Sequence, residues 1–334
     1  MKKNKILVTG AAGYIGGTFT YEVLKNGFKV HGIDNFINSN RNNIDTFSKD
    51  FPEAFNFSEI DLAKDVSKLK LVLDEFNPDF IIHFAGLKSV GESEEKPDLY
   101  MDNNVGSTRN LLENMNSETF FIFSSSATVY GNNPNQPLTE DSPIEATSVY
   151  GQSKIECENL IKDYAFNKGV KSICLRYFNP VGSHQEFIVV EDYLNQPNNL
   201  MPKLIECVKN GKNTINVYGS DYETKDGTGE RDYIHIIDLV EGHIAAMDKV
   251  QIIENIDFFN LGTGKSTSVV ELISTFNKTN EQSIKINFVE RRKGDVAICF
   301  SNPIKAHNEL NWQANLSLER MCKDAWEAVQ NEFK

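Results

Sequence analysis

The stretch "VTGAAGYIGG", residues 8–17, decides the fold class of this 334-residue chain. Gly10, Gly13 and Gly16 form a GxxGxxG motif between the apolar run "KILV" and a segment of helical periodicity that stops at Gly27. Glycines at this spacing let backbone N–H groups approach a pyrophosphate, whose charge the start of the following helix stabilises. An ordinary glycine turn is the alternative, but the strand–turn–helix context favours a dinucleotide-binding loop.

Strand and helix signals alternate outward from this motif through the first half of the chain. Apolar runs that predict buried strands occupy residues 5–10, 29–34, 79–86, 119–126 and 172–179. Strands that alternate with helices build a parallel sheet covered on both faces, and ligands bind beyond the carboxyl ends of its strands. We therefore predict an α/β protein with a Rossmann-type doubly wound parallel sheet over residues 1–180.

The pattern loosens after about residue 180, where residues 182–202 predict a long connecting loop. We expect residues 181–334 to form a smaller C-terminal α/β domain that binds the substrate. The segment near 233–258 is expected to pack back on the first domain. No proline- or glycine-rich linker separates the halves, which predicts close packing between them.

Composition excludes several classes of function. The formal net charge of −13 argues against nucleic-acid binding, because phosphate backbones are recognised by basic surfaces. No apolar run approaches the roughly 20 residues that span a bilayer, so we expect no membrane segment. The five cysteines are scattered and never spaced as CxxC, which predicts neither a disulfide framework nor a metal site. We expect a cytoplasmic protein with reduced thiols.

Asp34 ends the second predicted strand, 18 residues after Gly16. An acid at this place accepts hydrogen bonds from ribose hydroxyls and repels a 2′-phosphate. The sequence therefore favours NAD over NADP as the dinucleotide.

Two further stretches, "SSSATVYG" and "SVYGQSK", supply candidate chemistry. Ser124, Ser125 and Ser126 follow a predicted strand, while Tyr150 and Lys154 lie one helical turn apart on the same face. A serine-rich helix cap and a surface tyrosine–lysine pair are the alternatives. Taken together, a serine, a tyrosine and a lysine beside a nicotinamide form a proton-transfer unit for alcohol oxidation. A tyrosine base near neutrality needs its pKa lowered by about 3 units, which the Lys154 ammonium and an oxidised nicotinamide could supply.

With these motifs in place, the chain resembles the extended short-chain dehydrogenase/reductase family, and within it the UDP-glucose 4-epimerases. The resemblance runs over nearly the whole chain. It is carried by "VTGAAGYIG", "DN" at 34–35, "HFAGLKSVGES", "DNNV" at 102–105, "SSSATVYG", "YGQSK", "LRYFNPVG", "NNLMP", "DGTGERDYIH" and "RRKGD".

The resemblance implies an NAD-dependent isomerase whose chemistry is carried by Ser126, Tyr150 and Lys154. It implies an NAD site formed by Gly10, Gly13, Tyr14, Ile15, Gly16, Asp34, Asn35, Asn38, Ser39, Asp61, Leu62, Phe84, Ala85, Gly86, Lys88, Asn103, Ser124, Tyr150, Lys154 and Phe178. It implies a UDP-sugar site formed by Lys88, Ser126, Tyr150, Asn179, Asn199, Leu200, Tyr218, Arg231, Arg292, Asp295 and Cys299. Arg231 and Arg292 would offer forked donors to the diphosphate.

The family mechanism implies that Tyr150, as phenolate, takes the proton of the sugar 4-hydroxyl while the C4 hydride passes to bound NAD. The 4-keto sugar then turns about its link to the diphosphate, and hydride and proton return to the other face. Relatives also pair helices of two subunits, which implies a homodimer built here on segments near 103–116 and 150–167.

Two other functions of the fold are weighed against this expectation. A 4,6-dehydratase usually carries an Asp–Glu pair directly after the catalytic hydroxyl residue, where this chain has Ala127 and Thr128. A non-catalytic NAD sensor would be expected to lose Tyr150 or Lys154, and both are kept.

Two departures from the family pattern bear on the substrate. The loop from Gln185 to Gln196 differs from the glycine- and proline-rich acidic loop of relatives. Cys299 stands where many bacterial relatives carry a tyrosine beside the sugar, and a smaller side chain there implies acceptance of UDP-N-acetylhexosamines.

Overall fold

The fold is known from a computed structural model that describes residues 4–186, 199–292 and 294–331. A seven-stranded sheet with strand order β11-β6-β5-β4-β1-β2-β3 forms its centre, and every neighbouring pair in it is parallel. Its strands are β1 (Lys5–Thr9), β2 (Lys29–Asp34), β3 (Phe55–Glu59), β4 (Phe80–His83), β5 (Phe120–Ser126), β6 (Ser172–Tyr177) and β11 (Ile256–Leu261). The predicted doubly wound parallel sheet is therefore confirmed.

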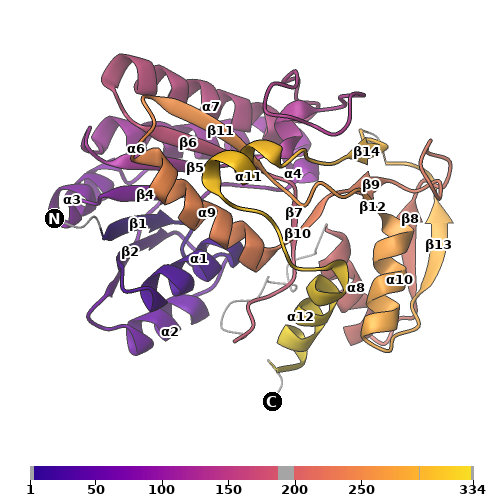
Figure 1. The fold of residues 1–334 in the computed structure, drawn as a ribbon. Coiled ribbons are helices and arrows are strands. Elements are labelled where there is room, and N and C mark those ends of the chain that lie inside the picture. Colours follow the sequence, from indigo (N-terminus) through magenta and orange to yellow (C-terminus); the bar gives the residue numbers. More distant parts are fainter. Residues whose placement is uncertain (1–3, 187–198, 293, 332–334) are drawn as a thin grey trace.

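Helices cover both faces of this sheet (Figure 1). One face packs against α1 (Tyr14–Lys25), α2 (Asn42–Asp50), α9 (Ile236–Val250) and α11 (Ile304–Leu310). The opposite face packs against α3 (Val66–Phe76), α6 (Gly106–Asn114) and α7 (Val149–Lys168). Between β4 and α6 lie the short helices α4 (Val90–Glu95) and α5 (Pro97–Tyr100) and the π-helical turn η1 (Met101–Val105); the 3₁₀ turn η2 (Ala127–Tyr130) follows β5.

The side-chain alternation of the strands explains the two helical layers. In β1, Ile6 and Val8 belong to the apolar core under α1 and α9, whereas Leu7 between them belongs to the core under α3 and α7. Successive side chains of a strand point to opposite faces, so a strand that is apolar at every position needs a cover on both sides.

A smaller lobe lies beside the sheet, on the right of Figure 1. It contains the strands β7 (Asn179–Val181), β8 (Thr214–Tyr218), β9 (Glu230–Arg231), β10 (Tyr233–His235), β12 (Thr267–Ser268), β13 (Lys285–Val289) and β14 (Ile298–Cys299). Its helices are α8 (Leu200–Lys209), α10 (Val269–Thr279) and α12 (Leu318–Asn331). The three helices, together with β8 and β13, share a second apolar core that includes Leu204, Val217, Phe276 and Ala325.

The sheet also takes elements from the second half of the chain. β11 pairs with β6 from Ile256↔Ser172 to Leu261↔Tyr177, and α9 packs on the same face as α1. The sequence did not predict β3 or β11 as strands. The long loop predicted over 182–202 lies largely outside the described residues.

The order of the strands places a crevice at one end of the sheet. β1 lies between β2 and β4. From β1 the chain first adds β2 and β3 on one side of the sheet, and it then returns to add β4, β5 and β6 on the other side. Ligands of open α/β sheets bind beyond the carboxyl ends of strands at such a switch point.

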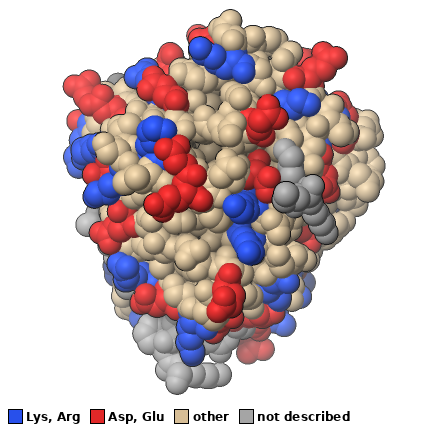
Figure 2. Space-filling view, turned by 90° about the vertical axis from the view of Figure 1, so that its left-hand side faces the viewer, with Lys and Arg blue, Asp and Glu red and all other residues tan. Residues whose placement is uncertain are grey.

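Acidic and basic side chains are interspersed over the face shown in Figure 2. No helix among the described residues is long and apolar enough to cross a membrane.

Candidate functional site

A cavity of about 2310 Å³ opens beyond the carboxyl ends of the strands and extends to the smaller lobe. A small-molecule site usually measures roughly 300–1,000 Å³, so this cavity has room for two ligands of moderate size. Of the residues predicted to bind cofactor or substrate, it is lined by Gly10, Gly13, Tyr14, Ile15, Gly16, Asp34, Asn35, Asn38, Ser39, Leu62, Phe84, Ala85, Gly86, Lys88, Asn103, Ser124, Ser126, Phe178, Asn179, Asn199, Tyr218, Arg231, Arg292, Asp295 and Cys299.

Two positions of the glycine loop, Gly10 and Gly16, are packed so closely that a side chain is excluded there. Gly10 has a φ of +71° and donates its N–H to the carbonyl of Ile33 at 2.8 Å. A Cβ on Gly16 would stand 2.2 Å from the Gly10 carbonyl oxygen, and one on Gly10 would stand 2.8 Å from the Ala85 nitrogen. Helix α1 then begins without a side-chain cap, so its first turn presents backbone N–H groups to the cavity.

Asp34, the last residue of β2, is hydrogen-bonded to the backbone of the glycine loop. Its Oδ2 accepts the N–H of Ala12 at 3.0 Å, and its Oδ1 accepts the N–H of Phe36 and the hydroxyl of Ser39, both at 2.9 Å. A carboxylate has about four acceptor sites, so one position remains for a hydroxyl of a bound ribose. The side chain lines the cavity although it is only 8% exposed.

The start of α7 holds Tyr150 in place. Ser148 caps the helix by accepting the N–H of Gly151 at 3.1 Å. Side chains of α4 accept from the backbone N–H groups of the two preceding residues: Glu94 accepts from Val149 at 2.9 Å, and Ser93 accepts from Tyr150 at 3.1 Å. The backbone of Tyr150 is therefore fixed from two helices.

The phenol of Tyr150 hydrogen-bonds with the side chain of Ser126, a residue that lines the cavity. Thr128 donates to the Ser126 oxygen twice, through its backbone N–H at 3.2 Å and its hydroxyl at 3.0 Å. With its oxygen accepting both bonds, Ser126 directs its own proton toward Tyr150, which favours a phenolate. Sequence reasoning set Thr128 aside because it is neither acid nor base, and no local signal marks its contact with Ser126.

Burial raises the pKa of Tyr150 to about 12, and the Ser126 hydrogen bond acts against that rise. Lys154 is also buried, and burial lowers its pKa. Its Nζ donates to the carbonyl of Ser124 at 2.7 Å and lies 5.8 Å from the centre of the Tyr150 ring. The protein groups alone therefore keep the phenol protonated near neutrality, and a further positive charge in the cavity is needed to lower its pKa.

Two arginines from the second half of the chain, Arg231 and Arg292, line the cavity. Arg231 donates to the Glu230 carbonyl at 2.9 Å, and its Nη2 lies 3.9 Å from Asp295. The guanidinium of Arg292 lies 3.9 Å from the centre of the Tyr218 ring. Both guanidinium groups line the cavity and keep N–H groups that can donate hydrogen bonds to an anion.

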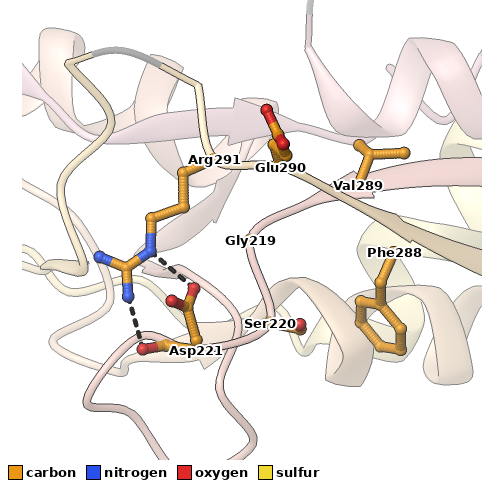
Figure 3. A pocket seen from close by; sticks show the side chains of 7 residues that line it. All are labelled: Gly219, Ser220, Asp221, Phe288, Val289, Glu290 and Arg291. Carbon is orange, nitrogen blue, oxygen red and sulfur yellow. Dashed lines mark hydrogen bonds and ion pairs between the residues drawn. The ribbon is translucent and has the colours of Figure 1, made fainter.

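Arg291, next to Arg292 in sequence, lies in a separate pocket of about 470 Å³ (Figure 3). Its Nε donates to the Asp221 carboxylate at 2.7 Å, and its guanidinium stacks 4.1 Å from the centre of the Tyr222 ring. Arg291 is therefore held by Asp221 and Tyr222, whereas Arg292 stacks on Tyr218 in the large cavity. Arg291 is not available to a ligand in that cavity.

Cys299 ends β14 beside Phe178 and lines the cavity wall. Burial raises the pKa of its thiol to about 11, so the group is neutral near pH 7. Its contribution to the cavity is therefore a small apolar surface.

Four predicted residues do not line the cavity: Asp61, Tyr150, Lys154 and Leu200. Asp61 accepts the N–H of Ala63 at 3.0 Å and pairs with Lys64 at 3.1 Å, which fixes the loop that brings Leu62 to the cavity. Tyr150 and Lys154 reach it through Ser126 and Ser124. Leu200 is the first residue of α8. Residues 187–196 of the atypical loop lie outside the described part of the chain.

These residues fit NAD on structural grounds. The close-packed glycines and the uncapped helix start match a pyrophosphate, and the carboxylate of Asp34 matches a ribose hydroxyl. Among the described residues, no group of three or more His, Cys, Asp or Glu side chains could hold a metal ion.

Comparisons with known proteins agree with this geometry. A family model described as GDP-mannose 4,6 dehydratase matches residues 7–325. The chain is 43% identical over 333 residues to UDP-glucose 4-epimerase 2 of Arabidopsis thaliana, covering 98% of this chain and 95% of the plant protein. It is 42% identical over 324 residues to the UDP-glucose 4-epimerase of Bacillus subtilis (strain 168), covering 96% and 95% of the two chains. A crystal structure of the UDP-glucose 4-epimerase of Stenotrophomonas maltophila, with bound NAD and formylated UDP-arabinopyranose, superimposes with a TM-score of 0.94 at 36% identity over 99% of each chain.

Proposed function

Because the chain belongs to the UDP-glucose 4-epimerases, within the family that the GDP-mannose 4,6 dehydratase model describes, we propose that it inverts C4 of UDP-glucose and UDP-galactose with bound NAD. One observation carries the proposal. The hydrogen-bonded series from Thr128 through Ser126 to Tyr150 adjoins, at Ser126, a cavity that has room for a dinucleotide and a nucleotide sugar.

The residues of this chain divide the work. The glycine loop, Asp34 and Lys154 would hold NAD, which supplies a hydride acceptor and donor when bound. Tyr150 takes the proton of the sugar 4-hydroxyl and returns it after the 4-keto sugar has turned over. Ser126 stabilises the phenolate by donating to it, and the Lys154 ammonium adds positive charge nearby.

Turning the sugar requires that its anchor stays fixed. Arg231 and Arg292 line the cavity and would clamp the diphosphate of UDP. With the diphosphate held in this way, the hexose would rotate about its link to the diphosphate without release.

The elimination chemistry of a 4,6-dehydratase has less support in this site. The position after Ser126 is occupied by Ala127, and Thr128 is committed to Ser126 by two hydrogen bonds. Neither side chain can act as the acid or base that removal of water needs.

The test begins with purified protein to which no cofactor is added. We expect denaturation to release NAD, and we expect the native protein to convert UDP-galactose to UDP-glucose without added NAD. Tyr150→Phe should release NAD equally but lose about 10²–10⁴-fold in kcat. Conversion that requires free NAD in proportion to product would contradict the proposal, as would a Tyr150→Phe variant of parental activity.

We further propose that UDP-N-acetylgalactosamine is epimerised, because Cys299 leaves space at the cavity wall. In Cys299→Tyr, the larger side chain would extend into the cavity. We expect kcat/KM for the N-acetylated sugar to fall at least tenfold and kcat/KM for UDP-galactose to change less than threefold. The reason is that the steric clash affects only the larger sugar. Cys299→Ser, which keeps the size of the side chain, is the control and should retain both activities. Equal turnover of the N-acetylated sugar by Cys299→Tyr and the parent would exclude this steric account.

We also propose a homodimer and a cytoplasmic location. The helices implied for the subunit contact, α6 and α7, lie on the same face of the sheet, and α7 exposes Phe166, of which 64% is accessible. Light scattering should give a mass of about twice the 37.7 kDa of one chain, and Phe166→Glu should lower it. The cytoplasmic proposal rests on the free state of all five cysteines.

A further inference from the structure

His243, on α9, is buried among aromatic rings next to the candidate NAD site. The centre of its ring lies 4.9 Å from the ring centre of Phe84 and 5.1 Å from that of Tyr177. Both of these residues line the cavity. Its Nδ1 lies 2.9 Å from the carbonyl oxygen of Leu239. Because a carbonyl oxygen only accepts, Nδ1 must carry the proton.

The other ring nitrogen is therefore an acceptor. Burial lowers the pKa of His243 to about 4, so the ring is neutral near pH 7 and Nε2 keeps its lone pair. The hydroxyl of Tyr177 is hydrogen-bonded to this Nε2, and it must donate its proton there. The tautomer of a buried histidine thus fixes the direction of a tyrosine proton.

The same argument extends one residue further. The oxygen of Tyr177 is also hydrogen-bonded to the side chain of Ser124. Since the Tyr177 proton is committed to His243, the Ser124 hydroxyl must donate. A serine hydroxyl has a single proton, so only its lone pairs remain for the cavity that Ser124 lines.

We propose that Tyr177 and His243 are positioning residues that make Ser124 a hydrogen-bond acceptor toward the carboxamide N–H group of the nicotinamide. The inference rests on the proposed function, since it requires NAD in this cavity. The carbonyl of Ser124 accepts from Lys154, so the serine that would orient the pyridine ring also orients the catalytic lysine. The ring would thus be held at a fixed rotation relative to Tyr150.

The test compares two dinucleotides on protein refolded free of nucleotide. NAD has a carboxamide, whereas its 3-acetylpyridine analogue has a methyl ketone at the same place and no N–H donor. By isothermal titration calorimetry we expect the parent to prefer NAD by about threefold to tenfold, the range of one neutral hydrogen bond. In Tyr177→Phe and His243→Phe the Ser124 proton is no longer fixed, and the preference should approach one.

Tyr222→Phe is the matched control, because the buried Tyr222 hydroxyl has no hydrogen-bond partner among the described residues. It should keep the parental preference. Each preference is a ratio measured on one variant, so a general loss of stability that weakens both ligands alike leaves it unchanged. An unchanged preference in Tyr177→Phe and His243→Phe, with NAD still bound and epimerase activity intact in the parent, overturns this inference alone. Failure of the parent to bind NAD overturns the proposed function itself.

Discussion

Thr128 donates two hydrogen bonds to the oxygen of Ser126. Ser126 is in turn hydrogen-bonded to Tyr150, the proposed phenolate. Thr128→Val keeps the β-branched shape and the backbone donor but removes the hydroxyl donor. The Ser126 oxygen would then be free to receive a competing donor, and its proton would point less consistently to Tyr150. We expect kcat to fall about threefold to tenfold with little change in KM, because the bond supports the transition state more than substrate binding. Steady-state kinetics with UDP-galactose measure both parameters.

Thr46→Val provides the comparison for this variant. Thr46 donates to the Asn42 carbonyl at 3.0 Å on an exposed part of α2, so the same chemical change is made away from the site. It should leave kcat and KM unaltered. A Thr128→Val enzyme with parental kcat would show that Ser126 needs no support from Thr128.

At the scale of elements, α7 is anchored to the sheet by a buried ion pair one turn after Lys154. Arg176 of β6 donates to both carboxylate oxygens of Glu158, at 3.0 and 2.8 Å, and Ser125 donates to Glu158 at 2.6 Å. The Arg176 and Glu158 side chains are only 3% and 4% exposed. The pair therefore holds the helix that carries Tyr150 against the strands that carry Ser124 and Ser126.

Glu158→Gln should be strongly destabilising, because it leaves the Arg176 charge buried without a counter-charge. We expect the free energy of unfolding to fall by about 3–5 kcal/mol, measured by urea denaturation. The exposed pair of Lys70 and Asp74, at 2.9 Å and 57% exposed on each side, supplies the control. Asp74→Asn should cost less than about 1 kcal/mol. Similar losses for the two variants would mean that burial adds nothing to the Glu158 contact.

The sequence predicted elements well where the signal is local. The apolar runs that form β1, β2, β4, β5 and β6 are properties of short segments. The same holds for the four-residue spacing of Tyr150 and Lys154. β11 was not predicted, because "IDFFNL" becomes a sheet strand only by pairing with β6, a contact that local periodicity does not encode. The same reason explains Thr128, Tyr177 and His243, whose importance arises from hydrogen bonds to other segments rather than from a motif.

At the scale of the whole molecule, the buried His83 makes the free energy of unfolding depend on pH. His83 ends β4 with its Nδ1 at 2.7 Å from the Thr9 hydroxyl and its Nε2 at 3.1 Å from that of Thr108. Burial first, and then the Lys154 charge, lower the pKa of His83 to about 3. An unfolded chain has a histidine pKa near 6.5. Between about pH 6.5 and 3 the unfolded state therefore binds a proton that the native state does not, and stability falls as the pH falls.

At pH 5 the His83 contribution is a loss of about 2 kcal/mol relative to pH 7, since each pKa unit corresponds to about 1.4 kcal/mol. We expect His83→Gln to reduce the pH 7-to-5 loss of unfolding free energy by about this amount, measured by urea denaturation at both pH values. His307→Gln, at an exposed position of α11, should leave the loss as it is in the parent. Carboxylates that titrate in the same range contribute equally to all three proteins, so the difference between them isolates the histidine. Parallel pH profiles for His83→Gln and the parent would show that His83 is protonated in the native state near pH 5, which its buried hydrogen bonds to Thr9 and Thr108 argue against.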